Sequence, residues 1–423
     1  MATDGDKLGN NIAQRKFRLA YVVSHPIQYQ AGLLRLIAGQ PDIDLLVLFC
    51  SDFSAKNYKD LGFGAEVQWD VPLMEGYRSV VLDRVRETSS PEPTRPISFG
   101  FFRHLQRGLD GLPFDAVWVH GYASVNALHA MLAAKALGIP VMVRAESWLE
   151  DRVRAPAKLF AKRMFCGLLR WLVDAVLPIG TRNQQYWAHY FGEAFPSFLM
   201  PYAVDNQYFA DKAAAALSTR AALQQELGIK PDRPVILFAS KLQERKHCDH
   251  LLEAFLQLER RPATPAPYLL IVGDGEMRPA LEQRVRESGS ADIRLVGFRN
   301  QSELPRLFDL STVFVLPSRH EAWGLITNEA MAAGLPVIVT EDAGCAVDLV
   351  RHGENGFIYP VGAIDALRDA LQRTLQPGMA AAMGQRSREI IAKCSYTEDL
   401  AGLRAALRTI TGGAANVAAD LGG

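Results

Sequence analysis

The sequence predicts an α/β protein that contains two doubly wound parallel-sheet domains. Short, nearly continuous apolar runs alternate with longer amphipathic segments over most of the 423 residues. Such runs are typical of parallel strands that are buried on both faces of a sheet, and strand–helix alternation indicates crossover connections. The pattern occurs before and after an Ala-rich, charged stretch between Asp205 and Arg233, so we expect two domains.

The clearest apolar runs are expected to be strands. In the first half of the chain they are residues 19–23, 45–49, 116–119, 141–143 and 175–179. In the second half they are residues 235–239, 268–272, 293–296, 313–316 and 337–339. The amphipathic segments 124–137, 250–259 and 276–288 are expected to be helices.

The domain boundary is expected near residues 205–209. The first domain is placed at residues 16–206 and the second at residues 207–394, with a final helix at about 395–411 that could pack back on the first domain. Residues 1–15 and 412–423 are expected to be flexible tails. Because open parallel sheets bind ligands beyond the carboxyl ends of their strands, we expect the site in the cleft between the domains.

Composition excludes several classes of protein. The chain has 46 basic and 46 acidic residues, and this balance argues against a general nucleic-acid binder, so no nucleic-acid partner is expected. At 49% hydrophobic residues the chain is also unlike a disordered protein.

Location and redox state follow from the cysteines and from the apolar runs. The five cysteines form no CxxC pair, so neither a disulfide framework nor a zinc module is expected and a reducing compartment fits. The polar N-terminus lacks the core of a signal peptide, and no apolar run reaches the ~18 residues of a membrane span. We expect a cytoplasmic protein, unless a surface segment makes it peripheral.

The stretch 316–340, LPSRHEAWGLITNEAMAAGLPVIVT, carries the clearest chemistry. A predicted strand ends before a loop that holds Glu321, and a short helix that holds Glu329 follows. The turn into this helix aims backbone N–H groups at the cleft, which suits a phosphate. The alternative interpretation is a capping acid and a surface acid on an ordinary helix.

This stretch resembles the glutamate-x7-glutamate signature of the family 4 retaining glycosyltransferases, which have the GT-B fold. The resemblance continues through AGCAVDLVRHGENGFIYP (343–360), LFASKLQERKHCDHLLEAF (237–255), LLIVGDGEMRPALE (269–282), IRLVGF (293–298) and PYAVDNQYF (201–209). It covers the second half densely and the first half thinly. It implies two Rossmann-like domains that face each other across a cleft.

The resemblance also implies roles for residues in the second half. Glu321 would contact the transferred sugar and Glu329 the ribose hydroxyls, and Lys246 would neutralise the diphosphate. Lys241 stands where the family usually has arginine, so it keeps the charge but loses the bidentate fork. The backbone at Trp323, Gly324 and Leu325 would approach the sugar and diphosphate, and Gly297 and Phe298 would lie near the base. The alternatives are a solvated turn for the two lysines and a core position for Phe298.

Candidates in the first half depart further from the family pattern. His120 follows a buried strand and would face the sugar or acceptor, with a satisfied core histidine as the alternative. His25, Gln28 and Tyr29 stand where many members have a Gly-rich loop that touches the diphosphate. Arg144 and Glu146 are expected either to recognise the acceptor or to pair with each other.

Residues 152–171 form a basic segment that contains no acidic residue. Apolar side chains recur in it at near-helical spacing, Pro156 can open the helix, and Trp171 stands at its end. One interpretation is a helix that lies on the anionic, cytoplasmic face of a membrane. The other is a helix that packs its apolar face on the sheet while its lysines face water.

Together these features predict a retaining glycosyltransferase without cofactor or metal. Its donor would be a nucleotide-diphosphate sugar, most plausibly a UDP- or GDP-sugar, and its acceptor a glycan or lipid-linked sugar in polysaccharide, lipopolysaccharide or other glycoconjugate biosynthesis. The alternatives are a nucleotide-sugar epimerase and a non-catalytic subunit of the same fold. A dehydrogenase is disfavoured because the sequence GDGEMR at 273–278 has Arg278 where a dinucleotide fingerprint needs its last glycine.

Overall fold

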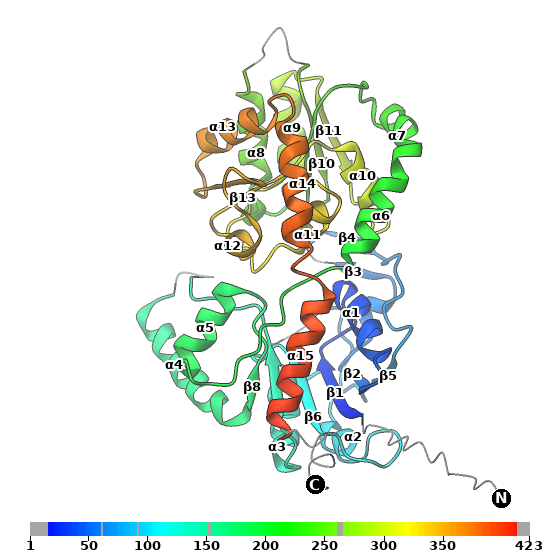
Figure 1. The fold of residues 1–423 in the computed structure, drawn as a ribbon, viewed down its shortest axis with the longest axis vertical. Helices are drawn as coiled ribbons and strands as arrows, with labels where there is room; N and C mark the ends of the chain where they lie inside the picture. The colour runs from blue at the N-terminus through cyan, green and yellow to red at the C-terminus, as the bar shows by residue number, and fades with distance from the viewer. Residues whose placement is uncertain (1–15, 61, 91–92, 151–153, 260–264, 413–423) are drawn as a thin grey trace, which may run out of the picture.

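The computed structural model describes residues 16–60, 62–90, 93–150, 154–259 and 265–412, and the two tails expected to be flexible lie outside these residues, except for Gly412. Two domains are stacked along the long axis of the molecule, each around a six-stranded parallel sheet (Figure 1). The prediction of two doubly wound domains is therefore confirmed.

The first sheet has the strand order β5-β2-β1-β6-β7-β8. Its strands are β1 (Phe17–Val23), β2 (Ile43–Phe49), β5 (Arg78–Val81), β6 (Ala116–His120), β7 (Val141–Arg144) and β8 (Ala175–Val176). In register, Leu19 faces Leu45 on one side and Ala116 on the other. The expected strand at 175–179 is shorter because Pro178 has no N–H to donate to the ladder.

Helices cover both faces of the first sheet. They are α1 (Gln28–Ala38), α2 (Phe101–Arg107), α3 (Val125–Ala136), α4 (Pro156–Leu169), α5 (Thr181–Phe191) and α15 (Tyr396–Ile410), with 3-10 turns η1 (Phe53–Ala55) and η2 (Arg170–Leu172). One core joins α1 and α15 to the sheet, and a second core joins α2, α3, α4 and α5 to the opposite face. Local signals set the helix starts, since Ser124 caps α3 and Pro156 opens α4.

The second sheet has the order β11-β10-β9-β12-β13-β14. Its strands are β9 (Val235–Ala239), β10 (Tyr268–Val272), β11 (Ile293–Gly297), β12 (Val313–Leu316), β13 (Val337–Thr340) and β14 (Gly356–Tyr359). Its helices are α6 (Asn206–Ala216), α7 (Arg220–Leu227), α8 (Cys248–Leu256), α9 (Arg278–Ser288), α10 (Leu304–Leu310), α11 (Leu325–Ala332), α12 (Ala346–Leu349), α13 (Ile364–Thr374) and α14 (Met379–Ile391), with turns η3 (Leu217–Thr219) and η4 (Glu244–Lys246).

Two segments cross between the domains. The chain passes from the first domain into α6, which packs against α10 and α11, and Asp205 caps α6 by accepting a hydrogen bond from Tyr208 N. The chain returns through α14 and α15, which run end to end across the domain boundary (Figure 1). Leu403 of α15 lies in the core of the first domain, and Arg404 forms an ion pair with Asp42. The final helix is thus part of the first domain.

A small hairpin stands apart from both large sheets. β3 (Tyr58–Asp60) pairs antiparallel with β4 (Ala65–Val67), and neither strand was expected from the sequence. Strands of three residues are too short to show a period-two pattern. In Figure 1 the hairpin lies at the boundary between the two domains, below α11.

Candidate functional site

Two cavities lie between the domains, at the carboxyl edges of the sheets. The larger, of about 920 Å³, is formed mainly by the first domain and is closed by residues of the loop after β12. The smaller, of about 520 Å³, is formed mainly by the second domain, with Gln28, Tyr29 and the β3–β4 hairpin contributing from the first. Arg245 lines both cavities, which are therefore adjacent.

Glu321 and Lys246 lie where the two cavities meet. The Lys246 ammonium donates a hydrogen bond to Glu321 Oε2, and Glu321 lines the larger cavity while Lys246 lines the smaller. The two side chains are only 12% and 9% exposed. Burial alone would raise the pKa of Glu321, but the charge and hydrogen bond of Lys246 outweigh it and hold that pKa below its usual value. Burial lowers the pKa of Lys246 while Glu321 opposes that shift, so each charge of this buried pair depends on the other.

Glu329 occupies the floor of the smaller cavity. It lies on α11 and is 7% exposed. Burial raises the pKa of Glu329 to about 8, so the carboxyl group is mostly protonated at neutral pH. A protonated carboxyl group can both donate and accept a hydrogen bond. This chemistry suits the hydroxyl groups of a ribose.

Lys241 also lines the smaller cavity but already has a partner. Its ammonium lies 2.8 and 3.0 Å from the two carboxylate oxygens of Asp60, in the hairpin of the first domain, and 4.8 Å from the ring centre of Phe63. Leu325 and Phe298 line the same cavity. The cavity therefore brings cationic and aromatic side chains together.

His120 ends β6 and lines the larger cavity. Burial, aided by the charge of Arg144, lowers the pKa of His120 to about 3, so the ring is neutral at physiological pH. Among the described residues no hydrogen-bond partner is found for its Nδ1 atom. A neutral imidazole that lines a cavity can bind a hydroxyl group of a ligand through a ring nitrogen that the cavity reaches.

Of the three candidate residues that follow β1, two line a cavity, and both stand at the start of α1. Gln28 and Tyr29 line the smaller cavity, and the Tyr29 hydroxyl donates to Glu146 Oε1 over 3.0 Å. His25 lines neither cavity: its ring stacks on Phe53 at 4.6 Å, and burial lowers its pKa to about 4. His25 therefore packs against Phe53 and contributes to neither cavity.

Arg144 and Glu146 are neither paired with each other nor both at the cavities. Glu146 lines the larger cavity. Arg144 is 1% exposed; its guanidinium donates to Asp399 on α15 and to the carbonyl oxygens of Met200 and Pro201. Its Nη2 group thus fastens the final helix to the first domain, and Arg144 lines neither cavity.

The turn into α11 is positioned by Trp323. Its indole N–H donates to Asn328 Oδ1 over 2.9 Å, and its ring packs on Tyr202. Trp323 also lines a third cavity, of about 630 Å³, beside the connection between α14 and α15. Gly324 has a φ of 93°, which favours glycine and lets the backbone turn directly into the helix. Gly297 has a φ of 74° and accepts a hydrogen bond from Gly273 N at the end of β11, so it shapes the backbone beside Phe298.

Arg245, Phe63 and Trp69 are among the cavity residues that were not identified from the sequence. Arg245 immediately precedes Lys246, and a run of charges before a helix was the available signal for it. Phe63 and Trp69 come from the irregular region around the hairpin, where no periodic pattern marks them.

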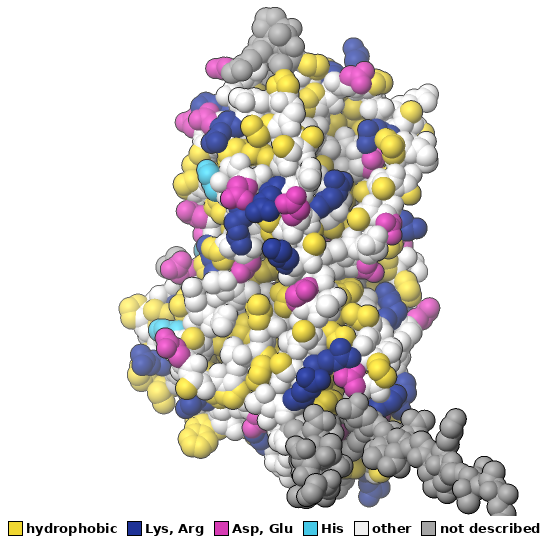
Figure 2. All heavy atoms as spheres, viewed as in Figure 1, with side chains coloured by type: hydrophobic (Ala, Val, Ile, Leu, Met, Phe, Trp, Pro, Cys, Tyr) yellow, Lys and Arg dark blue, Asp and Glu magenta, His cyan; other side chains and the backbone are white. Residues whose placement is uncertain are grey.

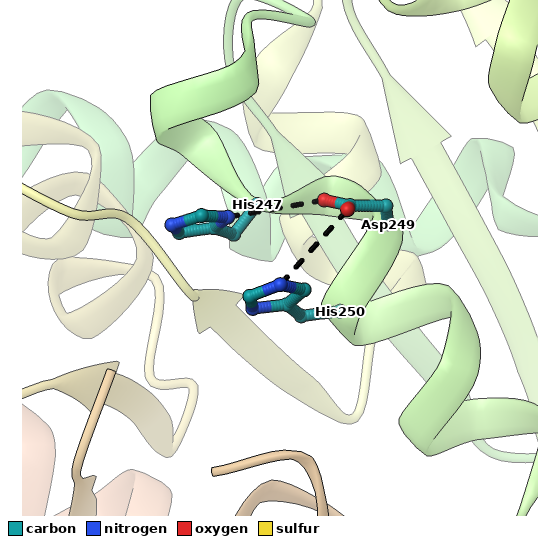
Figure 3. A group of neighbouring side chains, drawn as sticks. All are labelled: His247, Asp249 and His250. Carbon is teal, nitrogen blue, oxygen red and sulfur yellow. Dashed lines mark ion pairs between the residues drawn. The ribbon is translucent and has the colours of Figure 1, made fainter. Parts of the chain in front are cut away.

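One cluster of potential metal ligands is found among the described residues: His247, Asp249 and His250, at the start of α8. Figure 3 shows the two imidazole rings stacked, with their centres 4.1 Å apart and their planes 7° from parallel, and Asp249 3.9–4.0 Å from each. The lone pair of an imidazole nitrogen lies in the ring plane, so parallel stacked rings do not direct their lone pairs at one point. The trio as placed is a stacked histidine pair beside a carboxylate, whose two rings do not converge on one point.

Comparison with known proteins identifies the second domain. Residues 219–390 match the family described as glycosyl transferases group 1. The chain is 27% identical over 262 residues to the alpha-D-kanosaminyltransferase of Streptomyces kanamyceticus, covering 59% of this chain and 64% of the relative. It is 31% identical over 225 residues to a GDP-mannose-dependent alpha-(1-6)-phosphatidylinositol monomannoside mannosyltransferase of Mycobacterium tuberculosis, covering 51% and 56%. The chain thus spans less than two thirds of the length of these relatives.

Solved structures share the two-domain arrangement. The sucrose-phosphate synthase of Thermosynechococcus elongatus aligns with a TM-score of 0.65 at 18% identity over 94% of this chain and all of that chain. Anabaena HepE in complex with UDP and glucose aligns with a TM-score of 0.68 at 17% identity over 93% and 100%. These likenesses confirm the predicted GT-B fold, and the family match shows that the chain contains a glycosyltransferase group 1 domain.

Proposed function

We propose that the protein is a retaining glycosyltransferase that moves a sugar from a nucleotide-diphosphate sugar to a hydroxyl acceptor. The observation that carries the proposal is the Lys246–Glu321 pair at the junction of two cavities. The smaller cavity offers cations for a diphosphate and Glu329 for a ribose. The larger cavity offers space and polar side chains for an acceptor. A separate acceptor cavity of this size favours transfer over epimerisation of the donor alone.

The reaction takes place at the junction. The bond between the anomeric carbon and the diphosphate oxygen breaks, and its electron pair stays on the diphosphate, next to Lys246. The acceptor oxygen bonds to the same face of the anomeric carbon, and its proton passes to the departing diphosphate. Glu321 accepts hydrogen bonds from the sugar hydroxyls, and His120 orients the sugar or acceptor from the other side. Positive charge fixed where negative charge develops lowers the barrier.

The donor is proposed to be a UDP- or GDP-sugar, and a thermal-shift screen with UDP, GDP, ADP and dTDP tests this. A ligand that binds only the folded state stabilises it by about 2.7 kcal/mol at 100 times its Kd, so the correct nucleotide is expected to raise Tm by a few degrees. Glu329→Ala, which removes the proposed ribose contact, is expected to abolish the shift. No shift with any nucleoside diphosphate would contradict the proposal.

The acceptor is proposed to be a glycan or a lipid-linked sugar, reached at an anionic membrane surface through α4. Within the described residues, none of the helices combines the length and apolar character that crossing a bilayer requires. The expectation that the apolar face of α4 packs on the sheet holds only in part, because Cys166 and Leu169 are its buried residues. Large apolar side chains remain exposed along the helix and its end: Leu159, Phe160, Met164, Leu168 and Trp171, the last 83% exposed.

Basic side chains accompany this apolar surface. Lys158, Arg163 and Arg170 are exposed on the same segment. In Figure 2, hydrophobic and basic side chains adjoin at the left edge of the lower domain, where Figure 1 places α4 and α5. An exposed surface with aromatic and basic side chains is typical of helices that lie in the membrane interface.

Flotation with vesicles tests the membrane contact. We expect binding to anionic vesicles at low salt, little binding to zwitterionic vesicles, and loss of binding at high salt. Lys158→Ala/Arg163→Ala is expected to weaken the partition about 30-fold, because each basic residue near the surface contributes about 1 kcal/mol. Transfer to a water-soluble acceptor should not change. Binding that is equal for both kinds of vesicle, or absent at low salt, would contradict the proposal.

A further inference from the structure

A projection of the first domain reaches over the smaller cavity. We call residues 58–60 and 62–70, that is, the β3–β4 hairpin and the segment that follows it, the arm. The arm is an excursion between β2 and β5 of the first sheet, and its tip lies against the second domain (Figure 1). Gly62, Phe63 and Trp69 of the arm line the smaller cavity. The nucleotide site of the second domain therefore has a wall that belongs to the first.

Polar contacts hold the arm to the second domain at two points. Near the tip, Asp60 forms the ion pair with Lys241. At the other end, Asn300 Nδ2 donates to the carbonyl oxygen of Gln68 over 2.7 Å, and the Ser302 hydroxyl donates to Asp70. The two points flank the aromatic side chains of the arm, so these rings are held in a fixed position.

Three aromatic rings meet in the smaller cavity. Phe63 and Trp69 both pack edge-on to Phe298, with ring centres 4.8 and 6.3 Å apart and planes at 71° and 69°. Each ring is partly exposed, and none of the three belongs to the buried cores of the described residues. Large aromatic side chains that face a cavity and not a core offer π-faces to a ligand.

We propose that the arm completes the nucleotide site, with Phe63 and Trp69 of the first domain and Phe298 of the second binding the base of the donor. This inference rests on the function proposed above and adds Phe63 and Trp69 to the residues that bind the nucleotide. A nucleoside diphosphate has a planar base at one end and a multiply charged anion at the other. The cavity offers partners for both parts, because three aromatic rings line it together with Lys241, Lys246 and Arg245.

The Asp60 carboxylate contacts both a cation of the second domain and the backbone of the arm. Asp60 Oδ1 lies 2.8 Å from Lys241 Nζ and also accepts hydrogen bonds from Gly62 N and Phe63 N, over 2.8 and 3.0 Å. A Cβ atom on Gly62 would lie 2.6 Å from Lys241 Cδ, so the lysine side chain passes close to the backbone of the arm. Asp60 thus fixes the cation and the aromatic tip of the arm relative to each other.

Calorimetric titrations of the full chain with UDP, GDP and inorganic pyrophosphate test the inference. Trp69→Ala is expected to weaken binding of the accepted nucleoside diphosphate about 5- to 100-fold, the range that corresponds to one base–aromatic stack. Pyrophosphate, which has no base, should bind within twofold of wild type. Trp69→Phe should restore most of the affinity, and Phe63→Ala should weaken nucleotide binding by a similar factor. Nucleotide should also quench tryptophan fluorescence in the wild type but not in Trp69→Phe.

Phe102→Ala, on the exposed face of α2, is the matched control and should change neither affinity. Unchanged nucleotide affinity in Trp69→Ala would overturn the inference. An equal loss for nucleotide and pyrophosphate would also overturn it, because the arm would then have only a structural role. If wild type binds pyrophosphate but no nucleoside diphosphate, the proposed function itself fails. If nucleotide binding depends on Glu329 but not on Trp69, only the role of the arm fails.

Discussion

Lys246→Met is expected to slow sugar transfer by about 10²–10³-fold and to lower the free energy of unfolding by about 3–5 kcal/mol. The rate falls because the departing diphosphate loses the cation beside it. The stability falls because Glu321 stays buried as an ionised carboxylate without its partner. Initial rates with the nucleotide sugar identified by thermal shift, together with urea unfolding, measure the two effects separately.

The double variant Lys246→Met/Glu321→Gln is the control for this prediction. It replaces the buried ion pair with neutral groups of similar size, so most of the lost stability should return while transfer stays at least as slow as in Lys246→Met. A Lys246→Met protein that transfers sugar within tenfold of the wild-type rate would contradict the assigned role. A double variant as unstable as the single one would show that the pair does not account for the stability change.

The pair also predicts a dependence of stability on pH. The pKa of Glu321 is lower in the folded protein than its ordinary value of 4.5. The contribution of the pair to stability should therefore be complete above pH 4.5 and should be lost as the pH falls through the folded-state value. The difference in unfolding free energy between wild type and the double variant, measured across this range, isolates the effect from other carboxylates.

The sequence predicted most of the sheet strands and the second-domain half of the site. Nearly every buried strand is a continuous apolar run, and Glu321 and Glu329 lie within one ordered motif of the chain. Both features are local, so a linear pattern is sufficient to reveal them. β5, β14 and the hairpin strands were missed, because they are only three or four residues long and were not recognised as separate apolar runs.

Contacts between distant residues could not be predicted. Arg144 ends a strand, and its position alone suggested the cleft, but its partner Asp399 is 255 residues away. Likewise the spacing of apolar residues in α4 indicates a helix, but which of them are covered depends on neighbouring elements. Phe63 and Trp69 become a cavity wall only when the two domains meet. In each case the surroundings of the side chain depend on residues that are distant in the sequence, which a local pattern does not show.

Glu329→Gln is expected to change the dependence of stability on pH between pH 4.5 and 8. The pKa of Glu329 is about 8 in the folded protein and 4.5 in the unfolded chain. Between these values the folded state holds a proton that the unfolded state has released. Wild-type stability should therefore fall, relative to Glu329→Gln, by about 1.4 kcal/mol per pH unit from pH 4.5, and by about 5 kcal/mol in total at pH 8.

Urea unfolding of both proteins at pH 5, 6, 7 and 8 measures this difference, and other titrating groups cancel in the comparison. A difference that is constant across the range would show that Glu329 is not protonated in the folded state. Saturating nucleotide provides a further check, because ribose hydroxyls that donate to Glu329 favour its ionised form and should reduce the slope. This buried carboxyl group costs stability at neutral pH, and the proposed ribose contact would explain why glutamine does not stand in its place.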